Sequence, residues 1–248
     1  IDIMSRAARS LLVIARSGNI VEEFEEPFIE EMEQIAKQCY GLEVFRSMLS
    51  KQKNVRLIRD QISSEKKKSI QILLRLCILH IPETPIESYV QYIFSNNENY
   101  VPFVLEFLDS SYDKDVRSLI LPLIDRETDP VSRGQELFSE IAASIEHYLK
   151  VWAESGHEWK SAISIQCLLE SENISSLKTI NWDMVNPSIY LAQLFKDRLV
   201  DDTKIPLAKF QTKTESTMYT ILERTILLKS VDLFRNIPGE VLSRIAQI

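Results

Sequence analysis

Apolar residues recur at helical spacing along nearly the whole chain, and this repeat restricts the fold more than any other feature. In one stripe, Phe103, Val104, Phe107 and Leu108 follow Tyr100 at intervals of three, four, seven and eight residues. Stripes with similar spacing are Phe28, Met32, Ile35, Ala36, Cys39 and Tyr40; Val116, Leu119, Ile120, Leu123 and Ile124; Phe138, Ile141, Ile145, Tyr148, Leu149 and Trp152; and Met218, Ile221, Leu222, Thr225 and Ile226. A helix with one apolar stripe buries that stripe against its neighbours. We therefore predict an all-α fold with essentially no β-sheet.

The scarcity of glycine supports the same fold class. The chain has 5 glycines in 248 residues, whereas about 7% is usual. Tight β-turns and the phosphate-binding loops of dinucleotide-binding folds depend on glycine. A β-sandwich and a Rossmann fold are therefore disfavoured. The apolar share of 45% and the charged share of 26% are typical of a soluble globular protein.

Capping residues predict where several helices begin. Thr84–Glu87 combines an N-cap threonine, a proline in the first turn and a glutamate that closes a capping box. Asn186 and Pro187 repeat the cap and the proline, and Thr212 with Glu215 forms a further candidate box. The helices expected from stripes and caps together are 2–16, 20–40, 42–50, 54–81, 85–95, 98–110, 114–124, 133–155 with a break near 140, 158–170, 187–199, 214–229 and 238–248.

Glycine and proline predict where helices end or bend. Gly18, Gly41 and Gly156 each follow an apolar periodic segment, as glycines after a helix C-terminus do. Pro102 fits the first turn of its helix. Pro122 is expected to kink its helix or to lie in its last turn, because proline cannot donate the helical hydrogen bond.

A long helix is expected at the centre of the fold. Ile70–Ile81 is apolar on most sides, which is typical of a helix surrounded by others. We predict that its buried side chains include Leu73, Leu76, Cys77 and Leu79. Between 85 and 124, three short amphipathic helices follow one another with short connections. Packing them side by side would bury all three stripes, so we predict a HEAT-like α-solenoid, a right-handed helical superhelix.

No residue set points to catalysis or to a bound cofactor. The histidines His80, His147 and His157 have no partner at ligand spacing, and the chain lacks metalloprotease, serine-hydrolase, phosphate-loop and calcium-loop motifs. The cysteines, Cys39, Cys77 and Cys167, are scattered and resemble buried thiols of a reducing compartment. We assign no catalytic, cofactor-binding or metal-ligating residue, and we expect no enzyme and no cofactor.

Charge patterning leaves two interpretations open. The net charge of −7 disfavours nucleic acid as a partner. Glu22–Glu33 is strongly acidic, whereas Lys51–Lys68 is rich in lysine and arginine and ends in three consecutive lysines. These runs would attract each other across a pair of antiparallel helices, at about 0–1 kcal/mol for each exposed ion pair. Alternatively, the basic run could lie on anionic lipid headgroups.

The three tryptophans, Trp152, Trp159 and Trp182, lie around a predicted helix turn and a loop. Packing in the core or an interface is the ordinary interpretation. The alternative is a groove that receives a partner helix.

The C-terminal stretch Ile221–Ile248 resembles the helical lead-in to a cyclic-nucleotide-binding domain. It contains a helix, the short turn LKSVDLFRNIP and the opening of another helix. Leu228, Val231, Leu233 and Phe234 are expected to form a compact apolar turn before a helix that starts at Pro238. In that family the ligand contacts lie in a β-roll, so no cyclic-nucleotide residue is transferred to these positions.

A second resemblance covers much of the N-terminal part. Ile70–Pro82, Ile86–Ser95, Asn99–Asp109 and Val116–Asp125 are similar to the HEAT-repeat region of bacterial proteins related to ATP/ADP translocases. In some members a cyclic-nucleotide-binding domain follows that region, in the order found here. The resemblance implies a segment of a larger, membrane-associated protein. The chain itself has no apolar run of the roughly 20 residues that span a bilayer.

Together these patterns predict a domain organisation and a function. We predict a HEAT-like helical domain over 1–200, a polar linker over 201–213 and the lead-in helices over 214–248. The regularity of repeats in 126–200 stays open. We expect a non-catalytic helical scaffold or interaction domain that is the cytoplasmic regulatory part of a larger protein. Its expected partners are another protein or adjacent domains of its own chain. We expect it to reach a membrane only through a preceding domain. The alternative is a ligand-binding or catalytic helical domain with a pocket between helices.

Overall fold

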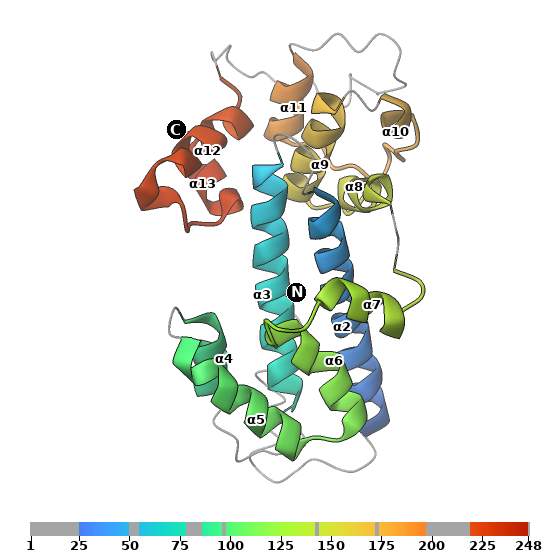
Figure 1. The fold of residues 1–248 in the computed structure, drawn as a ribbon. Coiled ribbons are helices and arrows are strands. Elements are labelled where there is room, and N and C mark those ends of the chain that lie inside the picture. The colour runs from blue at the N-terminus through green and yellow to red at the C-terminus, as the bar shows by residue number, and fades with distance from the viewer. Residues whose placement is uncertain are drawn as a thin grey trace. The chain divides into compact units, whose positions relative to one another are not determined.

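The predicted all-α fold class is confirmed. The computed structural model describes residues 25–49, 55–77, 86–95, 98–141, 144–171, 174–196 and 219–247, and all regular secondary structure in these ranges is helical (Figure 1). The chain divides into two compact units. Unit 1 comprises Ile1–Ser47 and Ser64–Ile141, and unit 2 comprises Met48–Ser63 and Ala142–Ile248. The predicted linker, 201–213, and the predicted helix 2–16 lie outside the described residues, so the domain division predicted from the sequence stays a prediction.

The described part of unit 1 contains two long helices, followed by a series of shorter ones. Its elements are α2 (Glu25–Met48), the larger part of α3 (Arg56–Cys77), α4 (Ile86–Phe94), the short 3₁₀ helix η3 (Glu98–Tyr100), α5 (Val101–Ser111), α6 (Lys114–Ile124) and α7 (Pro130–Leu137). From α4 to α7, each helix contacts the next one along the chain.

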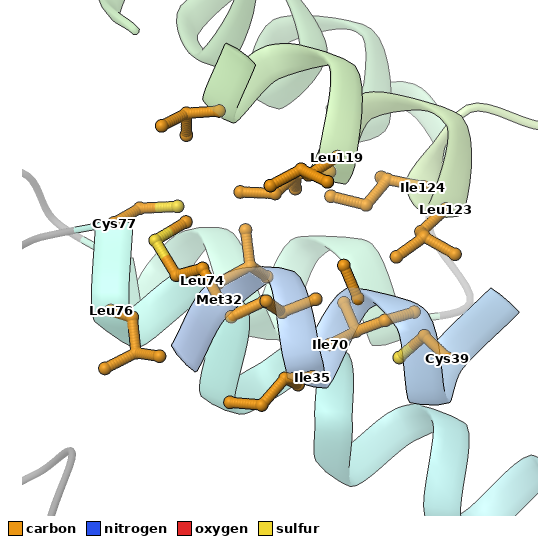
Figure 2. Packing of buried hydrophobic residues seen from close by; sticks show 14 of the residues in the cluster. Met32, Ile35, Cys39, Ile70, Leu74, Leu76, Cys77, Leu119, Leu123 and Ile124 are labelled. Carbon is orange, nitrogen blue, oxygen red and sulfur yellow. The ribbon is translucent and has the colours of Figure 1, made fainter. Parts of the chain in front are cut away.

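The core of unit 1 lies between α2, α3 and α6. Figure 2 shows Met32 of α2 and Leu74 of α3 on one side of the apolar cluster, with Leu119 and Leu123 of α6 facing them. The prediction of a buried central helix is confirmed for the described part of 70–81. Of the side chains named for it, Leu73, Leu76 and Cys77 are at most 5% exposed, and Leu79 lies outside the described residues.

Helix ends in unit 1 follow the proline predictions but not the glycine prediction. Pro102 lies in the first turn of α5 and Pro122 in the last turn of α6, as expected. The predicted helix end at Gly41 is wrong, because α2 continues through this buried glycine to Met48. Continuing the helix keeps Val44 and Phe45 fully buried, which stabilises α2 more than a capped end would.

Unit 2 is built around one helix that is buried on every side. Its elements are the first turns of α3, then α8 (Ile145–Ala153), α9 (Glu158–Glu170), α10 (Ile174–Lys178), α11 (Ile189–Lys196), α12 (Ile221–Ser230), the 3₁₀ helix η5 (Asp232–Phe234) and α13 (Gly239–Ile245). Every residue of α9 from Ser161 to Leu168 is buried, and α8, α10 and α11 all contact α9. The run SAISIQCLL has no charge and consists, apart from Gln166, of small and apolar residues, which allows this close packing.

The predicted helix ends in unit 2 are confirmed at Gly156 and corrected at Asn186. Gly156 has φ +71° and follows α8, so this glycine prediction is confirmed. Asn186 is not a cap, since its amide donates to the carbonyl of Gly156, whereas Ser188 Oγ accepts the backbone N–H of Leu191 at the start of α11. The predicted helix over 133–155 is interrupted near 140, as expected, and forms α7 and α8.

Candidate functional site

The helix pair α12 and α13 carries the candidate site, and α12 is fixed by its N-terminus. Thr220 Oγ1 accepts the backbone N–H of Glu223, and the Glu223 carboxylate accepts the backbone N–H of Thr220, which completes a capping box. The backbone N–H of Ile221 donates to Gln193 Oε1 of α11 at 2.8 Å. The predicted box at Thr212 and Glu215 lies outside the described residues.

A buried lysine fixes the other end of α12. The Lys229 ammonium lies 2.7 Å from Asp60 Oδ2 at the start of α3 and donates to the carbonyl of Arg235 at 2.7 Å. The Arg56 guanidinium in turn donates to the carbonyl of Lys229. Lys229 is only 3% exposed. The end of α12 and the turn after it are therefore held by polar contacts to α3.

The inner face of α13 is fixed by close packing and by one polar contact. Leu242 is fully buried, and the Ser243 hydroxyl shares a hydrogen bond of 3.0 Å with the Tyr190 hydroxyl of α11. Gly239 lies against the Trp159 ring, where a Cβ would come within 3.1 Å of a ring carbon. A larger residue at position 239 would push α13 away from α9.

The outer surface of this helix pair is unusually apolar. Leu227, Val231, Val241 and Ile245 are 46–54% exposed, and Leu233 on η5 is 79% exposed. Figure 1 shows α12 and α13 beside each other. The side chains of this helix pair form an open groove of about 430 Å³. The residues that line this groove, here called the α12–α13 groove, are Arg224, Leu227, Leu228, Val231, Ile245 and Ala246.

The groove is lined by an apolar stripe and one arginine. Arg224, Leu227, Leu228 and Val231 have the spacing i, i+3, i+4 and i+7, which presents one helix face. Arg224 Nε is covered, and no described residue gives this guanidinium a hydrogen bond or an ion pair. The site therefore offers apolar contact area together with a positive charge that lacks a partner in the described part of the chain.

The turn after α12 differs from its prediction. Pro238 caps α13 as expected, and Phe234 is half-buried. Val231 and Leu233 are exposed rather than part of a compact apolar turn, so that prediction is wrong. The interior of the turn is occupied by the Lys229 ammonium, which binds the carbonyl of Arg235.

The tryptophans and the cysteines form part of the cores. Trp152, Trp159 and Trp182 are at most 9% exposed, which confirms core packing. Burial raises the pKa of the Cys39 and Cys77 thiols to about 12 and that of Cys167 to about 11. The thiols are thus held in their neutral, unreactive form.

The histidines and acidic groups form no metal site in the described part of the chain. His147 and His157 are exposed, and His80 lies outside the described residues. No group of three or more His, Cys, Asp or Glu side chains that could hold a metal ion occurs among the described residues. Within the same ranges, no helix is both long and apolar enough to cross a bilayer.

The predicted attraction between the acidic and the basic run is not found among the described residues. Lys66 pairs with Glu43, which lies outside the acidic run, and the Lys67 ammonium lies 5.1 Å from the centre of the Phe94 ring. The Glu43–Lys66 ion pair and the courses of the two helices in Figure 1 show that α2 and α3 are antiparallel. Residues that precede Glu43 in α2 therefore lie beside residues that follow Lys66 in α3. Glu30–Glu33 thus lie beside the C-terminal part of α3, past Lys66, Lys67 and Lys68. The lipid alternative stays a hypothesis.

Comparisons with models of known protein families, with curated proteins and with solved structures give no match to this chain.

Proposed function

We propose that this chain is a non-catalytic helical interaction domain and that the α12–α13 groove is its contact surface. The observation that carries the proposal is the set of exposed apolar side chains on and around this groove, Leu227, Val231, Leu233, Val241 and Ile245. Contiguous exposed apolar surface is characteristic of protein contact sites. The helix pair that bears the surface is fixed at both ends of α12, which keeps the surface ordered before a partner binds.

The lining of the groove favours protein contact over the alternative, a ligand-binding or catalytic pocket. A catalytic pocket brings several titratable side chains together around a reacting group. The α12–α13 groove has five apolar side chains and one arginine. Such a lining offers contact area and one anchoring charge, but no pair of groups for acid–base or nucleophilic chemistry.

The finer architecture and the context of the chain are part of the proposal. We propose that unit 1 is a HEAT-like solenoid segment, and the contacts of each helix from α4 to α7 with the next support this. The sequence similarity to the HEAT region of translocase-like proteins and to the lead-in of cyclic-nucleotide-binding domains supports a cytoplasmic regulatory segment of a larger, membrane-associated protein. Its partner is then another protein or an adjacent domain of the same chain.

The contact surface can be tested with a pair of matched variants. Leu227→Glu places a charge in the groove, whereas Val151→Glu places one on α8 at a side chain of similar exposure outside the groove, 49% against 54%. Quantitative affinity capture from membrane and soluble fractions then compares both variants with the wild type. The proposal expects proteins that are lost with Leu227→Glu and retained with Val151→Glu. Identical capture by all three chains would contradict it.

A further inference from the structure

The most exposed large apolar side chain in the described part of unit 2 lies next to the groove in sequence. Leu233 is 79% exposed and follows Val231, which lines the groove, by two residues. We propose that the α12–α13 groove receives Leu233 of a second copy of this chain, so that two chains pair about a twofold axis. This inference rests on the proposed function, because it names the occupant of the same contact surface.

The position of Leu233 favours a closed pair. A twofold interface uses the same patch on both chains, so every contact occurs twice. The protruding leucine and the groove belong to one helix–turn–helix segment, α12–η5–α13, and only one residue separates Leu233 from Val231 of the groove lining. A protrusion and a pocket on distant surfaces would instead link chains into an open fibre.

Charges on the two parts are complementary. Asp232 directly precedes Leu233, and its side chain is 87% exposed. One of its carboxylate oxygens lies 2.8 Å from the Arg235 guanidinium, which leaves the other oxygen for a further partner. Arg224 in the groove has no ion pair with any described residue. Insertion of Leu233 brings the acid of one chain to the arginine of the other, twice in each pair.

The size of the surface predicts a weak, reversible association. Six groove residues and one inserted leucine cover less area than a standard stable interface, and contacts at the small end of the range are transient. We expect a dissociation constant in the micromolar range. Apolar insertion provides most of the affinity, and the Asp232–Arg224 contact determines the pairing of the chains.

Sedimentation equilibrium of the whole chain over a wide concentration range tests the inference. We expect a monomer–dimer equilibrium that weakens at least about tenfold in Leu233→Ser and is unchanged in the matched control Val151→Ser. Leu233 is exposed, so circular dichroism is expected to show an unaltered fold. A wild-type chain that stays monomeric, or a Leu233→Ser chain that associates like the wild type, would overturn the inference.

A charge exchange provides a second, independent test. Arg224→Asp and Asp232→Arg each create two like-charge contacts in a homodimer, so both variants are expected to be monomeric. An equimolar mixture of the two variants places opposite charges at both contacts of a heterodimer, and association is expected to return. A mixture that stays monomeric would overturn the inference.

The affinity-capture experiment with Leu227→Glu separates a failure of this inference from a failure of the proposed function. If the wild type is monomeric but captured proteins are still lost with Leu227→Glu, the groove is a contact surface and only its occupant, a second copy of the chain, is wrong. If Leu227→Glu also leaves the captured proteins unchanged, the proposed function fails as well.

Discussion

Gly134 of α7 lies directly against Tyr40 of α2: a Cβ at position 134 would come within 2.7 Å of the Tyr40 Cβ. The Tyr40 hydroxyl also donates to the carbonyl of Leu119 in α6 at 3.0 Å. One tyrosine therefore links three helices of unit 1. The contact with α7 requires a residue without a side chain.

Gly134→Ala is expected to destabilise the protein, although alanine is the better helix former by about 1 kcal/mol. Overpacking typically costs about 1–3 kcal/mol, and here the clashing atom is attached directly to the backbone of α2. Urea unfolding measures the change. The exposed neighbour Gln135→Ala is the control and is expected to stay within about 0.5 kcal/mol of the wild type. A Gly134→Ala protein as stable as the wild type would contradict the close approach.

The Asp60–Lys229 ion pair predicts an asymmetry between two substitutions. Asp60→Asn leaves the ammonium of Lys229, 3% exposed, without its counter-charge, and we expect a loss of about 2 kcal/mol. Lys229→Met leaves a carboxylate whose side chain as a whole is 29% exposed, although its Oδ2 is covered, so we expect a smaller loss of about 1 kcal/mol. Urea unfolding of both variants checks the order. A larger loss for Lys229→Met would be inconsistent with this geometry.

The capping box at the start of α12 predicts a local effect. Thr220→Ala removes the oxygen that accepts the N–H of Glu223 and is expected to cost about 1 kcal/mol. Glu223→Gln keeps an acceptor for the N–H of Thr220 and is expected to cost less. Hydrogen exchange of the first amides of α12, compared between the two variants, checks the prediction. Equal protection in both would argue against the box.

The cysteines predict a thiol reactivity that depends on folding. Because burial raises the pKa of Cys39 and Cys77 to about 12, the native thiols should not react with an aromatic disulfide reagent at pH 8. Unfolding in urea should expose all three cysteines of the chain. Rapid reaction of the native protein would contradict the burial.

The same shifts predict how the free energy of unfolding depends on pH. The folded state keeps thiol protons that the unfolded chain releases above about pH 9, the ordinary thiol pKa. The folded state then binds more protons, so the free energy of unfolding falls as the pH rises from about 9 towards 12. Replacing Cys77 with Ala should reduce this slope, and urea unfolding at several pH values measures it. A slope that is the same in the variant would contradict the cause.

Sequence periodicity was sufficient for the fold class and for the centre of unit 1. It was insufficient at α2, because a glycine after a periodic segment can either end a helix or lie inside one. Gly41 is buried within α2, which continues to Met48. α9 is central because its small residues allow neighbouring helices to pack against it from several sides. A search for one amphipathic stripe does not predict such a helix.

The candidate site was only partly predictable. α12 has two apolar stripes: Ile221, Leu222 and Thr225 face inward, whereas Leu227 and Leu228 line the groove. One buried face needs only one apolar stripe, so the second stripe of α12 was the feature of the sequence that indicated a contact surface. Leu233 lies in a turn whose Arg235 carbonyl accepts a hydrogen bond from the Lys229 ammonium, and Lys229 pairs with Asp60, which is far away in the sequence. Local pattern therefore could not predict these contacts.

Photo-cross-linking from position 233 shows whether Leu233 enters the groove of a second chain. A benzophenone amino acid in place of Leu233 is irradiated in the whole chain at micromolar concentration, with the same group at Val151 as the control, and the adducts are mapped by mass spectrometry. We expect a covalent dimer in which position 233 of one chain is joined to 224–231 or 245–246 of the other, and no such dimer from position 151. Absence of a dimer from position 233, or adducts outside the α12–α13 groove, would contradict this pairing.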